Sequence, residues 1–183
     1  SAAAQAGELA AVIFLHLLGE PFMHPGLPEI LAACSRLGLK VNLVTNGALL
    51  DKFGPGLFNE NCLTQVSVSL QALGGLPPAL RAGSLGRIMA FSLRKPPGLI
   101  VSLRLRGNPA APFIKETKAA LLGTLTREGA YEKVRDGLKL REGVYLNFGG
   151  IFDWPGGPGG KPKKGCLGLR NHFGILSDGR VVP

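Results

Sequence analysis

Cysteine is scarce in this sequence, which has only Cys34, Cys62 and Cys166 among its 183 residues. No two of them form a C-x-x-C pair, so the chain encodes neither a disulfide framework nor a closed zinc site. This cysteine usage is typical of a reducing compartment, and we therefore expect a cytoplasmic protein.

Long hydrophobic runs are missing too. The longest, Leu9 to Leu18, is interrupted by His16 and falls short of the roughly 20 residues that cross a bilayer. No basic segment precedes it, which argues against a signal peptide. Because 45% of the residues are hydrophobic and only 18% are charged, disorder is also excluded. The composition predicts a soluble globular protein with no membrane partner.

Acidic residues are few beyond residue 60. Residues 61–183 carry 18 basic and seven acidic residues, a net charge of +11, whereas residues 1–60 have a net charge of −2. Such an excess indicates either an anionic partner such as phosphate or an ordinary solvated basic surface. Arg104 and Arg106 form one basic cluster, and a second lies at 161–164. No aromatic residues are interleaved with these clusters, which argues against nucleic acid as a partner.

What the sequence does contain is a repeated alternation of strand and helix patterns. The apolar run at 12–17 predicts a parallel strand that is buried on both faces. Further strands are predicted at 40–45, 65–70, 99–105 and 143–148, and helical segments at 28–38, 48–53, 57–62, 77–93 and 113–128. The alternation predicts an α/β fold with a parallel sheet, either a barrel or a doubly wound sheet.

The pattern changes after residue 148. Residues 149–165 contain seven glycines and three prolines, which predicts a linker. Short strands are predicted at 172–177 and 180–182, on either side of an Asp178-Gly179 hairpin turn. We therefore expect an α/β unit at 1–148, a linker at 149–165 and the start of a smaller unit at 166–183.

Polar residues follow each predicted strand. The candidates for a ligand site are, in chain order, Gly19, Glu20, Pro21, Asn46, Ser69, Arg104 and Asn147. The carboxyl ends of parallel strands share one edge of a sheet, so this pattern predicts a site there. The two arginines are two residues apart in a strand and therefore share a face, which is either the site or the solvated surface.

Other noticeable side chains have simpler interpretations. His16, Cys34 and Cys62 lie among apolar residues, and we expect all three in the core. His24 lies just before a predicted helix, where it would cap the loop.

A family resemblance extends this interpretation. The run LHLLGEPFMHPGLPEILAACSRLGLKVNLVTNGALL resembles the second and third β/α units of radical S-adenosylmethionine enzymes, with their G-E-P turn and their strand ending in T-N-G. The segment VSVSLQAL resembles the fourth strand of that family. VYLNFGGIFDWPG and CLGLRNHFGILSDGRVVP resemble its sixth strand and the start of a SPASM-type auxiliary iron–sulfur domain.

The resemblance implies a partial (β/α)6 TIM-like barrel that lacks its first strand, followed by a truncated SPASM-like hairpin domain. It implies an enzyme that cleaves S-adenosylmethionine reductively at a [4Fe–4S] cluster and abstracts hydrogen with a 5′-deoxyadenosyl radical. The implied partners are a peptide or protein substrate and an electron donor such as flavodoxin or ferredoxin.

The resemblance also implies roles for individual residues. Gly19-Glu20-Pro21 would hold the amino group of the cofactor through backbone oxygens and the Glu20 carboxylate, and Asn46 of the T-N-G turn would belong to the same site. Ser69 would bind the carboxylate or ribose of the cofactor, and Arg104 its carboxylate. Cys166 would be the first ligand of an auxiliary cluster.

The sequence departs from the family pattern in several places. No C-x-x-x-C-x-x-C motif is present, and we expect it before Ser1, with the remaining auxiliary ligands after Pro183. Leu18 replaces the first glycine of the usual G-G-E-P, and Gln71 stands where relatives often have His or Asp. These departures predict a fragment that is inactive by itself.

Two other functions fit the same residues. One is a barrel relative without catalysis, serving as a binding module or partner subunit. The other is an unrelated α/β enzyme that binds a phosphorylated ligand through its basic residues.

Overall fold

The computed structural model describes residues 12–16, 19–150, 174–176 and 180–182. Cys166 and nearly all of the predicted linker lie outside these residues, so the predicted domain boundaries remain predictions. Among the described residues, no helix is long and apolar enough to cross a membrane.

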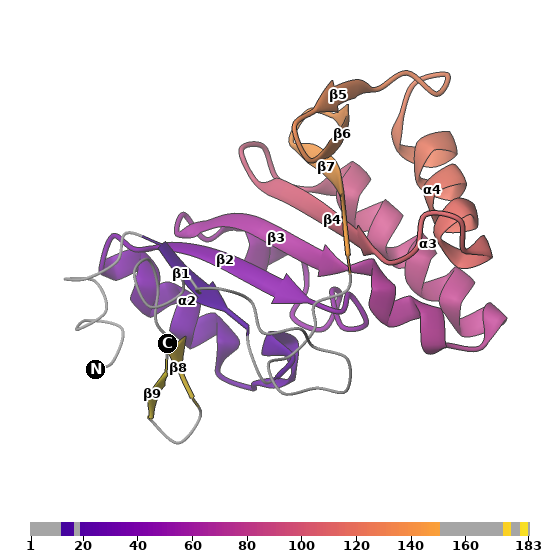
Figure 1. Cartoon of the computed structure of the whole chain (residues 1–183). Coiled ribbons are helices and arrows are strands. Elements are labelled where there is room, and N and C mark those ends of the chain that lie inside the picture. Colours follow the sequence, from indigo (N-terminus) through magenta and orange to yellow (C-terminus); the bar gives the residue numbers. More distant parts are fainter. Residues whose placement is uncertain (1–11, 17–18, 151–173, 177–179, 183) are drawn as a thin grey trace, which may run out of the picture.

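A seven-stranded sheet organises the described chain (Figure 1). Its strands are β1 (Val12–Leu15), β2 (Lys40–Thr45), β3 (Leu63–Ser69), β4 (Ile100–Arg106), β5 (Glu132–Val134), β6 (Gly137–Arg141) and β7 (Val144–Gly149). The order is β1-β2-β3-β4-β7-β6-β5. Neighbours among β1 to β4 and β7 pair in parallel, whereas β6 pairs antiparallel with both β7 and β5. The predicted α/β class and its five parallel strands are therefore confirmed.

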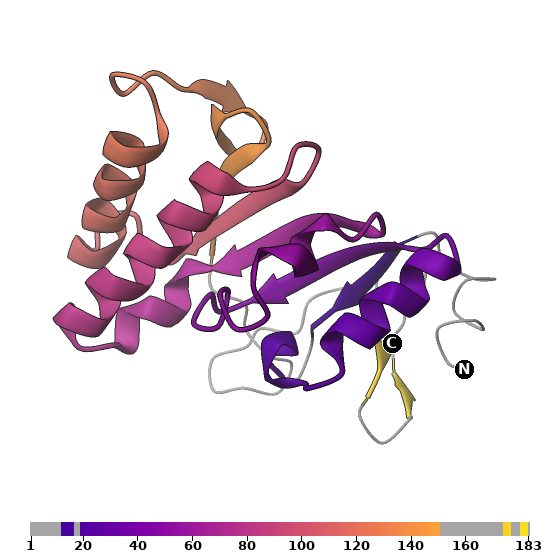
Figure 2. The same cartoon turned by 180° about the vertical axis from the view of Figure 1, so that it is seen from behind.

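Three long helices cover one face of this sheet. They are α2 (Leu27–Arg36), α3 (Pro78–Arg94) and α4 (Pro112–Leu125). Figure 2 shows α2 and α3 in front of the strands, with α4 beside α3, whereas Figure 1 shows the sheet from its other side. Each has a proline in its first two positions, where the missing N–H group costs nothing and the fixed φ angle favours a helix. The described helices thus form a single layer.

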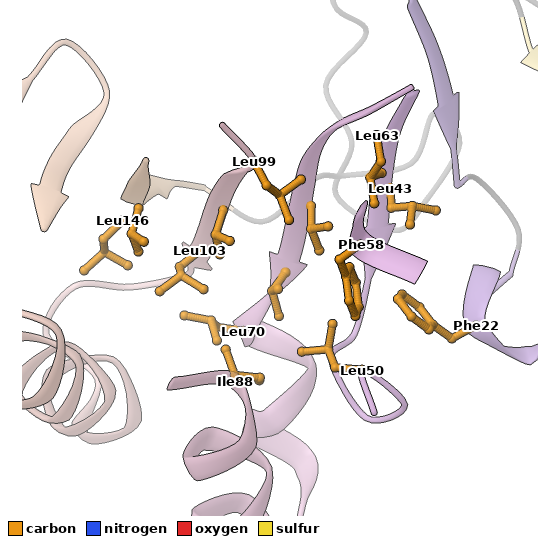
Figure 3. Close-up of a cluster of buried hydrophobic side chains, with 14 of the residues drawn as sticks. Phe22, Leu43, Leu50, Phe58, Leu63, Leu70, Ile88, Leu99, Leu103 and Leu146 are labelled. Carbon is orange, nitrogen blue, oxygen red and sulfur yellow. The ribbon is translucent and has the colours of Figure 1, made fainter. Parts of the chain in front are cut away.

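The hydrophobic core lies between the sheet and this helical layer. Alternate strand residues such as Leu43, Leu103 and Leu146 are fully buried there, together with Ile88 of α3 (Figure 3). The rings of Phe58 and Phe91 pack with their centroids 4.6 Å apart. Burying one such side chain contributes about 1.5–3 kcal/mol, so this layer supplies most of the stabilisation.

The opposite face of the sheet is polar. The registers bring alternate residues into rows, and one row across β3, β4 and β7 consists of Ser69, Arg104 and Asn147. The next row contains Ser67, Ser102 and Tyr145. This polar face is the side on which no described helix packs.

The sheet has β1 and β5 as its edges, so the described strands form an open sheet. An open, mostly parallel sheet with helices on one face is consistent with part of a TIM-like fold. β8 (Gly174–Ile175) and β9 (Val181–Val182) pair antiparallel at the predicted hairpin, but the turn between them lies outside the described residues.

Several local predictions were wrong. Residues 48–53 form turns rather than a helix, and the helical segment predicted at 57–62 is a 3₁₀ helix at Pro55–Asn59. The β5–β6 hairpin was missed; its two turn residues are Arg135 and Asp136, and Gly137 begins β6 in register with Val134. Gly137 is required by packing, because a Cβ there would collide with the β7 backbone.

The predicted burial of His16 was wrong as well. His16 is exposed, and β1 alternates between exposed and half-buried residues. β1 is an edge strand with a helical layer on one side only, so a continuous apolar run did not mean burial on both faces. Cys34 and Cys62 are buried as predicted.

Candidate functional site

Glu20 joins the turns that follow two neighbouring strands. Its Oε1 accepts a hydrogen bond from the Thr45 hydroxyl at 2.7 Å, and its Oε2 accepts one from the Asn46 N–H at 2.8 Å. Oε1 also accepts the Phe22 N–H at 3.3 Å. Hydrogen bonds to a carboxylate are about twice as strong as neutral ones, so this side chain fixes the Gly19-Glu20-Pro21 turn beside Asn46.

The turn after β2 is itself closely specified. Thr45 Oγ1 accepts the Gly47 N–H at 3.0 Å, and Asn46 Oδ1 accepts the Ala48 N–H at 2.8 Å. Gly47 has φ +81°, and a Cβ there would lie 2.8 Å from a methyl group of Ile88. Position 47 therefore requires a glycine both for its positive φ and for the space beside Ile88, which explains the last residue of the T-N-G turn.

Residues 52 and 53, which follow β2, contact the turn that contains Glu20. It contains a 3₁₀ helix at Pro21–Met23, in which Phe22 is fully buried. The Lys52 ammonium donates to the Phe22 carbonyl at 2.9 Å and lies 4.9 Å from the centre of the Phe53 ring. The carbonyls of Glu20 and Pro21 accept from Met23 and His24, whereas no described residue donates to the carbonyl of Gly19.

Hydrogen bonds also connect the polar face of the sheet. Ser67 Oγ donates to Asn42 Oδ1 at 3.2 Å and accepts from Gln65 Nε2 at 2.8 Å. On the other side of β4, Ser102 Oγ donates to Asn147 Oδ1 at 2.9 Å. These contacts hold the polar side chains in place across four strands.

Arg104 and Arg106 both lie on this polar face, beside a hollow of about 590 Å³ over β4 and β7. The sequence left open which face of β4 carries the two arginines, and the structure places them on the polar face. Burial, and secondarily the charge of Arg106, lowers the pKa of Arg104 below its usual value. No described residue gives Arg104 an ion pair or hydrogen bond, so its guanidinium is available for an anion.

The predicted candidates thus fall into two groups at the carboxyl edge. Gly19, Glu20, Pro21 and Asn46 are brought together by hydrogen bonds, and Ser69 lies in register with Arg104. The Ser69 hydroxyl caps no helix. Cys166 lies outside the described residues. His24 has the expected capping role, since its Nδ1 accepts the Gly26 N–H at 3.1 Å.

The sequence reasoning missed the residues within the strands. Ser67, Ser102 and Tyr145 line the polar face, yet only strand ends were considered as candidates. The signal was the alternation of polar and apolar residues in TQVSVS and VSLRLR. Gln71 is a further residue of note, because its buried Oε1 has no hydrogen-bond partner among the described residues.

The described residues contain no cluster of three or more His, Cys, Asp or Glu side chains that would hold a metal ion. Cys34 and Cys62 lie in the core instead, and burial raises the pKa of both thiols.

No family model matches the sequence. Among solved structures, the chain is similar to a crystal structure of archaeal TYW1, with a TM-score of 0.46 and 15% sequence identity. The match covers 71% of this chain and 57% of that chain, so the chain spans little more than half of the structure it matches.

Proposed function

We propose that this chain is the cofactor-binding part of a radical S-adenosylmethionine enzyme. The observation that carries the proposal is the Glu20 carboxylate, which ties the G-E-P turn to the T-N-G turn at 2.7 and 2.8 Å. Those are two of the motifs on which the family resemblance rests. Their meeting at the carboxyl edge of adjacent parallel strands is what a shared ligand site requires.

The residues at this edge suit the amino-acid end of the cofactor. The Gly19 carbonyl, to which no described residue donates, would accept from its ammonium group, while Glu20 holds the turn in place. The side chain of Asn46 accepts the Ala48 N–H through Oδ1, and its NH₂ group would be the donor to a ligand. The Ser69 hydroxyl and the Arg104 guanidinium, which no described residue pairs, would hold the carboxylate.

When bound, S-adenosylmethionine would supply the 5′-deoxyadenosyl group for hydrogen abstraction. The described residues do not fit a [4Fe–4S] cluster, because they offer no set of three cysteines. The cluster ligands, Cys166 as an auxiliary ligand, the electron donor and a peptide or protein substrate remain parts of the proposal for the parent enzyme.

Thermal unfolding of the 183-residue chain tests cofactor binding without requiring activity. We expect S-adenosylmethionine to raise the Tm by several degrees, since about 1 kcal/mol shifts a domain of this size by roughly 2–4 °C. Arg104→Gln should reduce the shift, and Arg94→Gln, an exposed site at the end of α3, should not.

The second candidate, an α/β enzyme for a phosphorylated ligand, is favoured by the two arginines at the hollow. Glucose 6-phosphate is therefore the comparison ligand in the same experiment. A Tm shift with the phosphate and none with S-adenosylmethionine would replace the radical-enzyme proposal with this one.

A further inference from the structure

The hollow on the polar face is built from three strands and the turn before β6. Gln65 comes from β3, Arg104, Arg106 and Ser102 from β4, Tyr145 and Asn147 from β7, and Asp136 from the β5–β6 turn. The hollow has a volume of about 590 Å³ and is broadly open to solvent.

Its charge is unbalanced. Neither arginine forms a salt bridge with any described residue. Asp136, the only carboxylate among the lining residues, is not within ion-pair distance of either one. Two like charges on one strand face repel each other, and burial adds to the cost of the Arg104 charge. An anion in the hollow would reduce the repulsion between the two arginines and the cost of burying the Arg104 charge.

Arg106 is already positioned for such an anion. One of its terminal nitrogens donates to the Gly150 carbonyl at 3.4 Å. The same nitrogen lies 2.8 Å from where a Cβ on Gly149 would be, so the absence of that side chain makes room for the guanidinium. A guanidinium has five N–H groups, and those of Arg106 that do not face Gly150 donate to no described residue.

The cofactor would leave this charge unmatched, because its single carboxylate would pair with Arg104 only. We propose that the hollow binds a second anion, the oxyanion group of the substrate, through Arg106. The oxyanion is a carboxylate, as on an acidic peptide side chain, or a phosphate. The proposal rests on the proposed function in assigning Arg104 to the cofactor and this anion to a substrate, whereas the anion site at Arg106 is argued from the lining residues alone.

The rest of the lining indicates what is attached to the oxyanion. Ile100 is 38% exposed, and Tyr145 lies one strand away on the same face. Ser102 is in register with Tyr145 and Asn147 with Arg104, and the Ser102 hydroxyl donates to Asn147 Oδ1 between these two rows. A ligand with an anionic end and a short apolar portion would match this arrangement.

Isothermal titration calorimetry on the full chain provides the test, with glutarate as the carboxylate probe, pyrophosphate as the phosphate probe and neutral glutaramide as the control. We expect glutarate or pyrophosphate to bind and glutaramide not to bind. Arg106→Gln should raise the Kd of the bound anion at least tenfold, whereas Arg94→Gln, with the same charge change, should raise it less than twofold. Arg106→Lys keeps the positive charge but loses the paired N–H donors of the guanidinium, so its Kd should lie between those of the other two variants.

The two probes distinguish the two sources of the oxyanion, and preference for either supports the site. The proposal is overturned if neither anion binds, or if Arg106→Gln has no larger effect than Arg94→Gln. Circular dichroism checks that each variant is folded, and Arg106→Lys carries the test if Arg106→Gln is not. Anion binding without any S-adenosylmethionine shift would contradict the proposed function and leave this site intact.

Discussion

Glu20 is a positioning residue at the candidate site. An ionised carboxylate only accepts hydrogen bonds, and Glu20 uses both oxygens for donors from three residues. Glutamine has nearly the same shape but offers one accepting oxygen and one donating NH₂ group. At least one of these donors would therefore face another donor.

We predict that Glu20→Gln lowers the free energy of unfolding by about 1–3 kcal/mol, the cost of losing a charged hydrogen bond and leaving a partner unsatisfied. Urea unfolding measures this change. Glu116→Gln, at an exposed position of α4, is the matched control and should change stability by less than about 0.5 kcal/mol. Equal effects of the two substitutions would show that the Glu20 contacts contribute nothing.

The two buried thiols should make stability depend on pH. Burial raises the pKa of Cys34, and nearby Cys62 raises it further; burial also raises the pKa of Cys62. The folded protein therefore keeps both protons at a pH where the unfolded chain has begun to lose them. Stability is complete below the ordinary thiol pKa and is lost as the pH rises through the folded value.

We predict a decline in the free energy of unfolding above about pH 8.5, with a slope of at most about 1.4 kcal/mol per pH unit for each thiol. Urea unfolding from pH 7.5 to 9.5 measures it. The Cys34→Ala/Cys62→Ala double variant is less stable at every pH, but its slope should be shallower. An unchanged slope would mean that the thiols ionise equally in both states.

At the scale of elements, the parallel strands were predictable because their patterns are local. β2 has the predicted bounds, and β3, β4 and β7 differ from them by one or two residues. Proline at the start of each helix is equally local. The β5–β6 hairpin was missed because Glu132 and Lys133 are exposed and leave little apolar alternation to detect.

The face on which each strand residue lies was not predictable in the same way. Val12, Phe14 and His16 are all exposed on β1, although the run looks continuously apolar. Alternation can assign residues to the same face, but it does not say whether a helical layer covers that face. The positions of Arg104 and Arg106 were left open for the same reason.

The sequence predicted which edge of the sheet the candidate residues share, but not how they contact one another. Polar residues at strand ends indicated a common edge, because parallel strands all end there. The bonds from Glu20 to Thr45 and Asn46 span 25 and 26 residues and depend on how the turns pack, as does the contact of Lys52 with Phe22. Local patterns carry no information about such contacts.

At the scale of the whole molecule, the two faces of the described sheet carry different kinds of side chain. Its helix-covered face holds the apolar core, and its other face carries the hydrogen-bonded polar residues and the arginines. Substitutions on one face should therefore act mainly on folding, and substitutions on the other mainly on ligands.

Neighbouring residues of β4 test this separation directly. Leu103 is fully buried against the helices, whereas Ser102 faces the hollow and donates to Asn147. We predict that Leu103→Ala lowers the free energy of unfolding by about 2–5 kcal/mol, because it leaves a cavity in the core. Ser102→Ala loses one hydrogen bond at a partly open site and should cost about 1 kcal/mol. Urea unfolding of both variants measures the difference, and comparable losses would mean that the polar face is as important for folding as the core.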